Sequence, residues 1–159
     1  MATTLGVLNA AQLAVLLNPP MINLSGSPTL ASSGSSYYAL PLSSRVSGSG
    51  NIVWSSGTNP SRVTAVTPGT YTILGGINWP ATLGATNAGR AQIVINGAAT
   101  NTKFSTVAGS TGNVTAVCAG AEVLNAGDYL EIYANQSSGA TITLTSVRLY
   151  VCLSSLATS

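Results

Sequence analysis

The sequence contains no histidine and very few charged residues. Charged side chains make up 5% of the 159 residues, whereas a typical soluble domain carries about 25%. Without histidine, neither a Ser-His-Asp nor a Cys-His catalytic device can be assembled. A transition-metal site would also lack its commonest ligand. We therefore expect a protein that is not an enzyme.

Carboxylates are equally scarce, since Glu122, Asp128 and Glu131 are the only three. Glycoside hydrolysis needs a pair of acids on either side of the scissile bond. Glu122 and Asp128 flank a turn, and Asp128 is better suited to holding that turn with its own side chain. The segment Gly48-Ser49-Gly50 lacks the third glycine and the following helix of a nucleotide-binding loop. We expect no metal and no cofactor.

The basic residues do not form a patch. The formal net charge is +2, and the five basic residues are scattered singly, so no nucleic-acid partner is expected. A free monomer normally uses charge to stay soluble and to prevent sheet edges from pairing. So little charge indicates a tight oligomer or a surface largely covered by partners.

The two cysteines, Cys118 and Cys152, both lie within apolar runs. Two cysteines are too few for a disulfide framework or a structural zinc site. The simplest interpretation is two small buried hydrophobic residues. A bridge between them, worth about 4 kcal/mol by loop entropy, remains an alternative because the sequence does not place their Cα atoms.

The strongest structural signal covers residues 67–79, which read TPGTYTILGGINW. Their side chains alternate with a period of two, which predicts a β-strand. Leu74 lies on the second phase, so both faces carry apolar residues and we expect a central strand covered on both sides. Similar short runs separated by turn signals predict an all-β sandwich. Further expected strands are 37–42, 62–66, 90–95, 103–107, 114–124, 128–134 and 140–153.

The first 44 residues contain no charge. Leucines recur there at helical spacing until Asn18-Pro19-Pro20, which should end a helix. Residues 5–17 are too short to span a bilayer, and no basic segment precedes them as in a signal peptide, so no membrane partner is expected. We expect residues 1–36 to be an apolar arm and Ser/Gly linker, and residues 37–159 to be the folded domain. The leucines expected to dock the arm onto a partner are Leu5, Leu8, Leu13, Leu16 and Leu17.

Four motifs in a fixed order resemble a known fold family. They are Gly69-Thr70-Tyr71 at the start of a strand, residues 92–97 (QIVING), Ala126-Gly127-Asp128, and the apolar last strand 147–153. Together they resemble the C1q/TNF-like jelly roll. More narrowly, the stretches SRVTAVTPGTYTILGGINW, GRAQIVING and AGDYLEIYANQSSGA resemble C1q-like structural proteins of tailed phages that infect actinobacteria, of the capsid decoration or minor tail type. Asn18-Pro19-Pro20 before the domain also fits that group.

The resemblance implies a jelly roll that forms a homotrimer about a threefold axis. It also implies that strands 70–79, 128–134 and 140–153 share the sheet that faces this axis. Strand phase then predicts the core-facing residues Tyr71, Ile73, Ile77, Leu130, Ile132, Leu149 and Val151. The outward residues expected at the trimer interface are Leu74, Glu131, Tyr133, Arg148, Tyr150 and Cys152. Glu131 and Arg148 are placed to pair across subunits.

The function implied by the resemblance is that of a non-enzymatic virion protein. It would decorate or cement the capsid exterior after assembly in the host cytoplasm, with its arm on the major capsid protein, another virion protein or a neighbouring subunit. The alternative is a minor tail or receptor-binding protein that contacts a host surface glycan through Trp54 or Trp79 and loops 82–87 and 108–113. Trp79 ends a core strand, which favours packing over binding.

Overall fold

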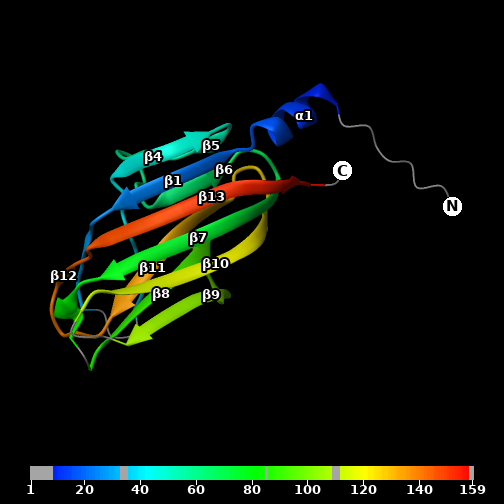
Figure 1. Cartoon of the computed structure of the whole chain (residues 1–159). Helices are drawn as coiled ribbons and strands as arrows, with labels where there is room; N and C mark the ends of the chain where they lie inside the picture. The colour runs from blue at the N-terminus through cyan, green and yellow to red at the C-terminus, as the bar shows by residue number, and fades with distance from the viewer. Residues whose placement is uncertain (1–8, 33–35, 85, 109–111, 158–159) are drawn as a thin grey trace.

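The computed structural model of the chain is a sandwich of two β-sheets preceded by one helix (Figure 1). The structure describes residues 9–32, 36–84, 86–108 and 112–157, and it describes the side chains of all of these except residue 16 and residues 99–108.

Five antiparallel strands form the front sheet of Figure 1, in the order β10-β7-β13-β1-β4. Their bounds are β1 (Met21–Gly26), β4 (Ser44–Ser49), β7 (Gly69–Trp79), β10 (Val114–Leu124) and β13 (Ser146–Leu156). β7 is hydrogen-bonded to β10 on one side and to β13 on the other. The expected central strand at 67–79 is therefore confirmed, but only one of its faces is covered, since Leu74 on the other face is 45% exposed.

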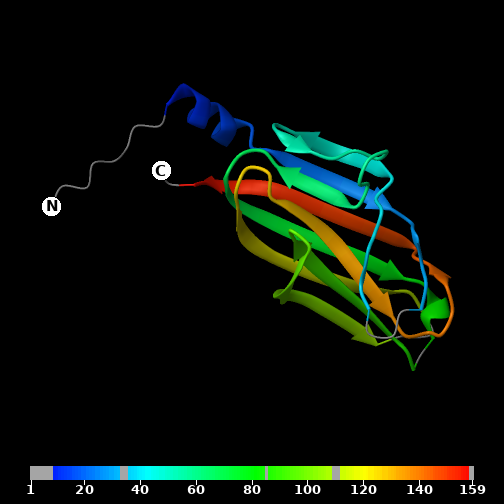
Figure 2. The same cartoon turned by 180° about the vertical axis from the view of Figure 1, so that it is seen from behind.

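The back sheet has the order β5-β6-β11-β8-β9, with β3 paired to β11, and Figure 2 views the molecule from that side. Its strands are β3 (Tyr38–Ala39), β5 (Ile52–Val53), β6 (Arg62–Ala65), β8 (Ala88–Ile95), β9 (Ala98–Ala108) and β11 (Tyr129–Gln136). β2 (Thr29–Leu30) pairs with β12 (Ile142–Thr143), and a 3-10 turn, η1 (Ala81–Leu83), follows β7. Asn96 and Gly97 both have positive φ in the β8–β9 turn, as this dipeptide predicts.

The core lies between the two sheets and is filled by alternate side chains of β1, β6, β7, β8, β10, β11 and β13. β7 contributes Tyr71 and Trp79, both fully buried. The Tyr71 hydroxyl donates a hydrogen bond to the Thr67 carbonyl at 2.7 Å, so its polar end is satisfied. All of the core residues predicted from strand phase are buried: Tyr71, Ile73, Ile77, Leu130, Ile132, Leu149 and Val151.

β1 corrects the expected division of the chain at residue 36. It pairs with β13 on one side and β4 on the other, and its Ile22 and Leu24 are fully buried. The sandwich therefore begins near residue 21. β4 is not among the expected strands, because its side chains bury little and backbone pairing with β1 forms it.

The position of β11 differs from the prediction as well. The resemblance placed this strand in the same sheet as β7 and β13, but it pairs with β6, β8 and β3 in the back sheet. The expected strand 140–153 is divided into β12 and β13. Alternation along a strand shows which residues share a face, but it does not show which sheet the strand joins.

The helix α1 (Ala10–Leu17) starts with a capping box. The Asn9 side chain accepts a hydrogen bond from the Gln12 backbone at 2.9 Å, and the Gln12 side chain accepts one from the Asn9 backbone at 3.0 Å. Within the described part of the chain, no helix is long and apolar enough to cross a membrane.

Asp128 holds the turn before β11, as predicted. Its carboxylate accepts hydrogen bonds from the Asn125 backbone N–H at 2.7 Å and from the Asn96 side-chain amide at 2.8 Å. These bonds hold the pKa of Asp128 below its ordinary value. Asn96 also accepts a bond from the Tyr129 N–H, so one side chain ties the β8–β9 turn to the start of β11.

We predict that Gly89→Ala destabilises the fold by about 1–3 kcal/mol, the usual cost of overpacking a core. A Cβ at this position would lie 2.5 Å from Cε2 of the fully buried Trp79 ring. Gly57→Ala is the matched control, because a Cβ there has no atom within 4 Å in the described structure. Urea denaturation of both variants measures the difference, and equal stabilities would contradict the packing described.

Candidate functional site

The outward surface of the front sheet is the candidate functional site. Strand register sets its side chains in rows. One row runs through Ala119, Leu74, Tyr150 and Asn23. The next runs through Val117, Gly76, Arg148 and Ser25. We call this surface the front face, and it comprises Asn23, Ser25, Thr72, Leu74, Gly76, Val117, Ala119, Ala121, Val123, Arg148, Tyr150 and Cys152.

The front face is apolar and almost uncharged. Leu74, Val117 and Val123 are exposed there. Arg148 is the only charged residue among the side chains that make up the front face. A large apolar surface of this kind is unfavourable in water and typical of an interface.

The centre of the front face is hollowed. The depression has a volume of about 400 Å³, and a Cβ added to Gly76 would have no described atom within 4 Å. Glycine in a strand interior often marks a close approach by another backbone or a ligand. The residues lining the depression are Asn23, Leu74, Gly75, Gly76, Val117, Arg148 and Tyr150.

Four of the six residues predicted for the trimer interface are brought together on this face. Leu74 and Tyr150 are register partners on β7 and β13, and Arg148 and Cys152 lie two residues to either side of Tyr150. Hydrogen bonding with the Cys152 thiol, followed by partial burial, raises the pKa of the Tyr150 hydroxyl. Tyr150 is therefore neutral at physiological pH and can be covered without a charge penalty.

Glu131 and Tyr133 do not belong to this face, because β11 is in the back sheet. Glu131 is only 4% exposed. Its carboxylate accepts hydrogen bonds from the Ser61 hydroxyl at 2.7 Å and the Tyr133 hydroxyl at 3.3 Å, and lies 3.9 Å from Arg62 Nε. The partners of Glu131 are thus in its own chain. The expectation that Glu131 and Arg148 share one face and pair across subunits is therefore wrong.

The helix α1 presents leucines that the sandwich does not cover. Leu17 is 77% exposed and Leu13 is 48% exposed, whereas Val15 packs against the core. Leu5 and Leu8 lie outside the described residues, as does the side chain of Leu16. The docking role of the arm therefore stays a prediction, with Leu13 and Leu17 available to a partner.

The structure also tests the other candidate residues. Trp79 is fully buried, so it cannot contact a glycan, whereas Trp54 is half-buried. Both cysteines are free thiols, and Cys118 is buried in the core as predicted. Within the described residues, no group of three or more potential metal ligands occurs.

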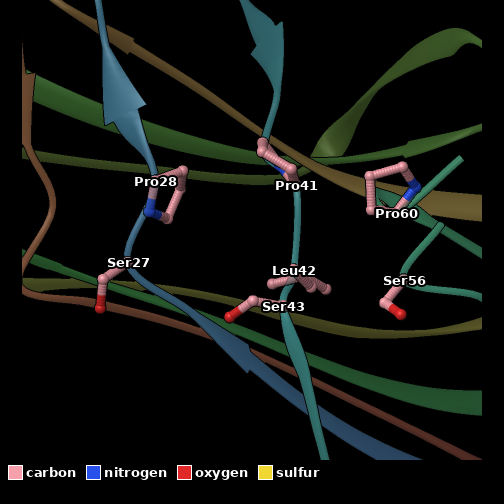
Figure 3. Close-up of a pocket in the computed structure, with 7 residues that line it drawn as sticks. All are labelled: Ser27, Pro28, Pro41, Leu42, Ser43, Ser56 and Pro60. Atoms are coloured by element: carbon pink, nitrogen blue, oxygen red, sulfur yellow. The ribbon is translucent and has the colours of Figure 1, made fainter.

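A second depression, of about 440 Å³, lies among three loops (Figure 3). Its walls come from the β1–β2, β3–β4 and β5–β6 connections and include Pro28, Pro41 and Pro60. No charged side chain is among its described lining residues, so it offers no ionic group to a ligand.

Sequence reasoning missed two parts of the front face. Val117 and Val123 belong to the expected strand 114–124, but the prediction did not say which of its residues face outward. Asn23 and Ser25 were attributed to the arm and linker, although Ile22 and Leu24 alternate with them at strand spacing. That alternation was the signal that could have found them.

Comparisons with known proteins fit this architecture. No protein-family model matches the chain, and no curated protein matches its sequence. Among solved structures, murine APRIL at pH 5.0 aligns with a TM-score of 0.60 at 12% identity, covering 84% of this chain and 98% of APRIL. The globular domain of zebrafish complement 1qA aligns with a TM-score of 0.55 at 10% identity, covering 87% and 98%.

The fold is the C1q/TNF-like jelly roll. Pika GITRL gives the same result, with a TM-score of 0.53 at 15% identity over 89% of this chain and 99% of GITRL. Identities this low establish the similarity of the folds alone. The jelly roll predicted from the order of motifs is confirmed, together with the short N-terminal helix.

We predict that the Cys118 thiol does not react with alkylating reagents in the folded protein. Burial raises the pKa of its thiol to about 11, so almost no thiolate, the reactive form, is present at pH 8. Iodoacetamide at pH 8, followed by peptide mass spectrometry, should label Cys118 only after urea is added. Rapid labelling of Cys118 in the native protein would contradict its burial.

Proposed function

We propose that the chain is a non-enzymatic structural protein that forms a homotrimer through the front face and decorates or cements the exterior of a phage capsid. The observation that carries the proposal is the front face itself: an apolar, hollowed surface with a single charge. A second copy of the chain is the simplest partner, since the sheet is present in every subunit and a rotationally closed ring hides it in all of them.

The position of Arg148 constrains the assembly. A guanidinium that is fully desolvated without a partner costs several kcal/mol, and no acid belongs to the front face as defined here. Arg148 is the register partner of Gly76 and lines the central depression together with Leu74 and Val117. The proposed assembly must therefore keep its guanidinium hydrated, or supply it with hydrogen-bond acceptors, in the middle of the interface. Tyr150 lines the same depression and combines an apolar ring with a polar hydroxyl.

The arm supports the virion part of the proposal. The first 44 residues carry no charge, and α1 exposes Leu13 and Leu17. Such a helix can bury its leucines only on something outside the sandwich, here the major capsid protein or a neighbouring subunit. Binding of many copies to one lattice would stabilise the fold by mass action. The stability of the bound protein would then not depend on surface charge. The resemblance to phage C1q-like proteins points the same way.

The alternative is a minor tail or receptor-binding protein that contacts a host glycan. Its support is reduced because Trp79 is fully buried, which leaves Trp54 as the one of the two tryptophans available to a sugar. The two proposals differ in what the isolated protein binds: empty capsids for a decoration protein, and host cells or wall material for a tail protein.

We predict that Tyr150→Glu converts the trimer to a monomer at micromolar concentration. The substitution places a carboxylate in the proposed interface, where burying it is costly, but at a partly exposed position of the single subunit. Tyr38→Glu is the matched control, because Tyr38 is exposed on β3 in the back sheet. Light scattering gives both masses, and thermal unfolding shows that each variant is folded. A trimeric Tyr150→Glu protein would place the interface elsewhere.

We also predict that a Leu13→Asp, Leu17→Asp double variant stays trimeric but no longer co-sediments with empty capsids. The change removes two exposed leucines of α1, whereas Ala11→Asp with Ala14→Asp adds the same charge at exposed alanines of that helix. The alanine-site variant should retain capsid binding. Unchanged binding by the leucine variant would remove the arm from the docking site, and binding of the unaltered protein to host cells but not to capsids would favour the tail alternative.

A further inference from the structure

A third hollow lies at the edge of the back sheet, away from the front face. It occupies about 210 Å³ beside the loop that joins β5 to β6. Because it is not part of the proposed trimer interface, its function can be tested separately from the assembly. The residues that line it are Val53, Trp54, Ser55, Thr58, Asn59, Arg62 and Thr64.

The loop that shapes this hollow is held by its own hydrogen bonds. The Trp54 indole N–H donates to the Pro60 carbonyl at 2.8 Å and so fixes the ring across the base of the loop. The Thr58 N–H donates to the Ser55 hydroxyl at 3.3 Å, and the Arg62 N–H donates to the Asn59 carbonyl at 2.9 Å. A loop ordered in this way loses little conformational entropy when a ligand binds.

Arg62 is the only charged side chain among the described residues of the hollow, and it is fixed from behind. Its guanidinium stacks on the Tyr129 ring, 3.6 Å from the centroid, and its Nε lies 3.9 Å from Glu131. Glu131 is itself held by Ser61 and Tyr133. Within the described residues, the terminal nitrogens of Arg62 make no hydrogen bond, and 35% of the side chain is exposed.

These groups suit one class of ligand. A guanidinium edge matches a carboxylate with two parallel hydrogen bonds. Trp54, which is partly buried against the core, lines the same hollow and adds an apolar aromatic surface. The hydroxyl groups of Ser55, Thr58 and Thr64, with the Asn59 amide, can bond sugar hydroxyls. The volume equals that of about seven liquid waters, at roughly 30 Å³ each, which suits one sugar ring rather than several. We propose that this hollow binds a single carboxylated sugar residue, such as a hexuronate unit of a polysaccharide.

The indole N–H signals of the full-length protein in ¹H–¹⁵N NMR spectra provide the test. D-glucuronate, added at concentrations on the order of 1–10 mM, the range expected for so small a contact, should shift the Trp54 signal in a saturable manner. The Trp79 signal is an internal reference, because that side chain is fully buried and should not move. D-glucose and acetate, at the same concentrations, should produce little shift, since each lacks one half of the ligand.

Arg62→Lys keeps the charge but loses the planar fork. We expect it to weaken glucuronate binding about tenfold, the equivalent of one charge-assisted hydrogen bond. Arg45→Lys, at an exposed position on β4 in the other sheet, should bind as the unaltered protein does. Asn59→Gly provides a second test that does not threaten the fold, because Asn59 has a φ of 51° that glycine adopts freely. It should weaken binding through loss of the amide.

The following results of the binding experiments would overturn the proposed acidic-sugar site. Equal shifts with glucose would make this a neutral-sugar site, and equal shifts with acetate would make it a simple anion site. No saturable shift with glucuronate, or unchanged affinity in both Arg62→Lys and Asn59→Gly, would show that the hollow does not bind acidic sugars. A protein that proves monomeric but binds glucuronate would refute the proposed assembly and leave this site intact.

Discussion

The placement of β7 between β10 and β13 is the constraint on which the rest of the structure depends. With its side chains alternating, β7 sends Tyr71, Ile73 and Ile77 into the core and presents Leu74 and Gly76 on the opposite surface. A shift of one residue in register would exchange the two sets. The strand that anchors the core therefore also builds the face to which we assign assembly.

The ion pair between Glu131 and Arg62 lies in the back sheet. The acidic Glu131 is enclosed by the hydroxyls of Ser61 and Tyr133 and lies next to Arg62, all in the back half of the sandwich. The front face retains Arg148 alone. This separation leaves one surface suited to burial against another subunit and another, around Arg62, suited to a small polar ligand.

The sequence predicted those features that depend on local alternation and turn chemistry. The bounds of β10, the Asn96-Gly97 turn, the role of Asp128 and the burial of Tyr71 all follow from such patterns. It did not predict which sheet β11 joins, because that depends on contacts between strands distant in sequence. It also missed β1, which was assigned to the arm and linker, and β4, which was not among the expected strands, although backbone pairing makes both of them strands. The front face was predicted only in part, because Asn23 and Ser25 belong to β1, which was not expected to be a strand.

The central claim is that the front face is covered by further copies of the chain. The most direct test is the mass of the unaltered protein in solution at micromolar concentration, measured by light scattering after size-exclusion chromatography. The account predicts a mass three times that of the 15.9 kDa chain. A mass equal to one chain, in a protein that remains folded, would contradict it and would leave the exposed Leu74, Val117 and Tyr150 surface without the partner that we assign to it.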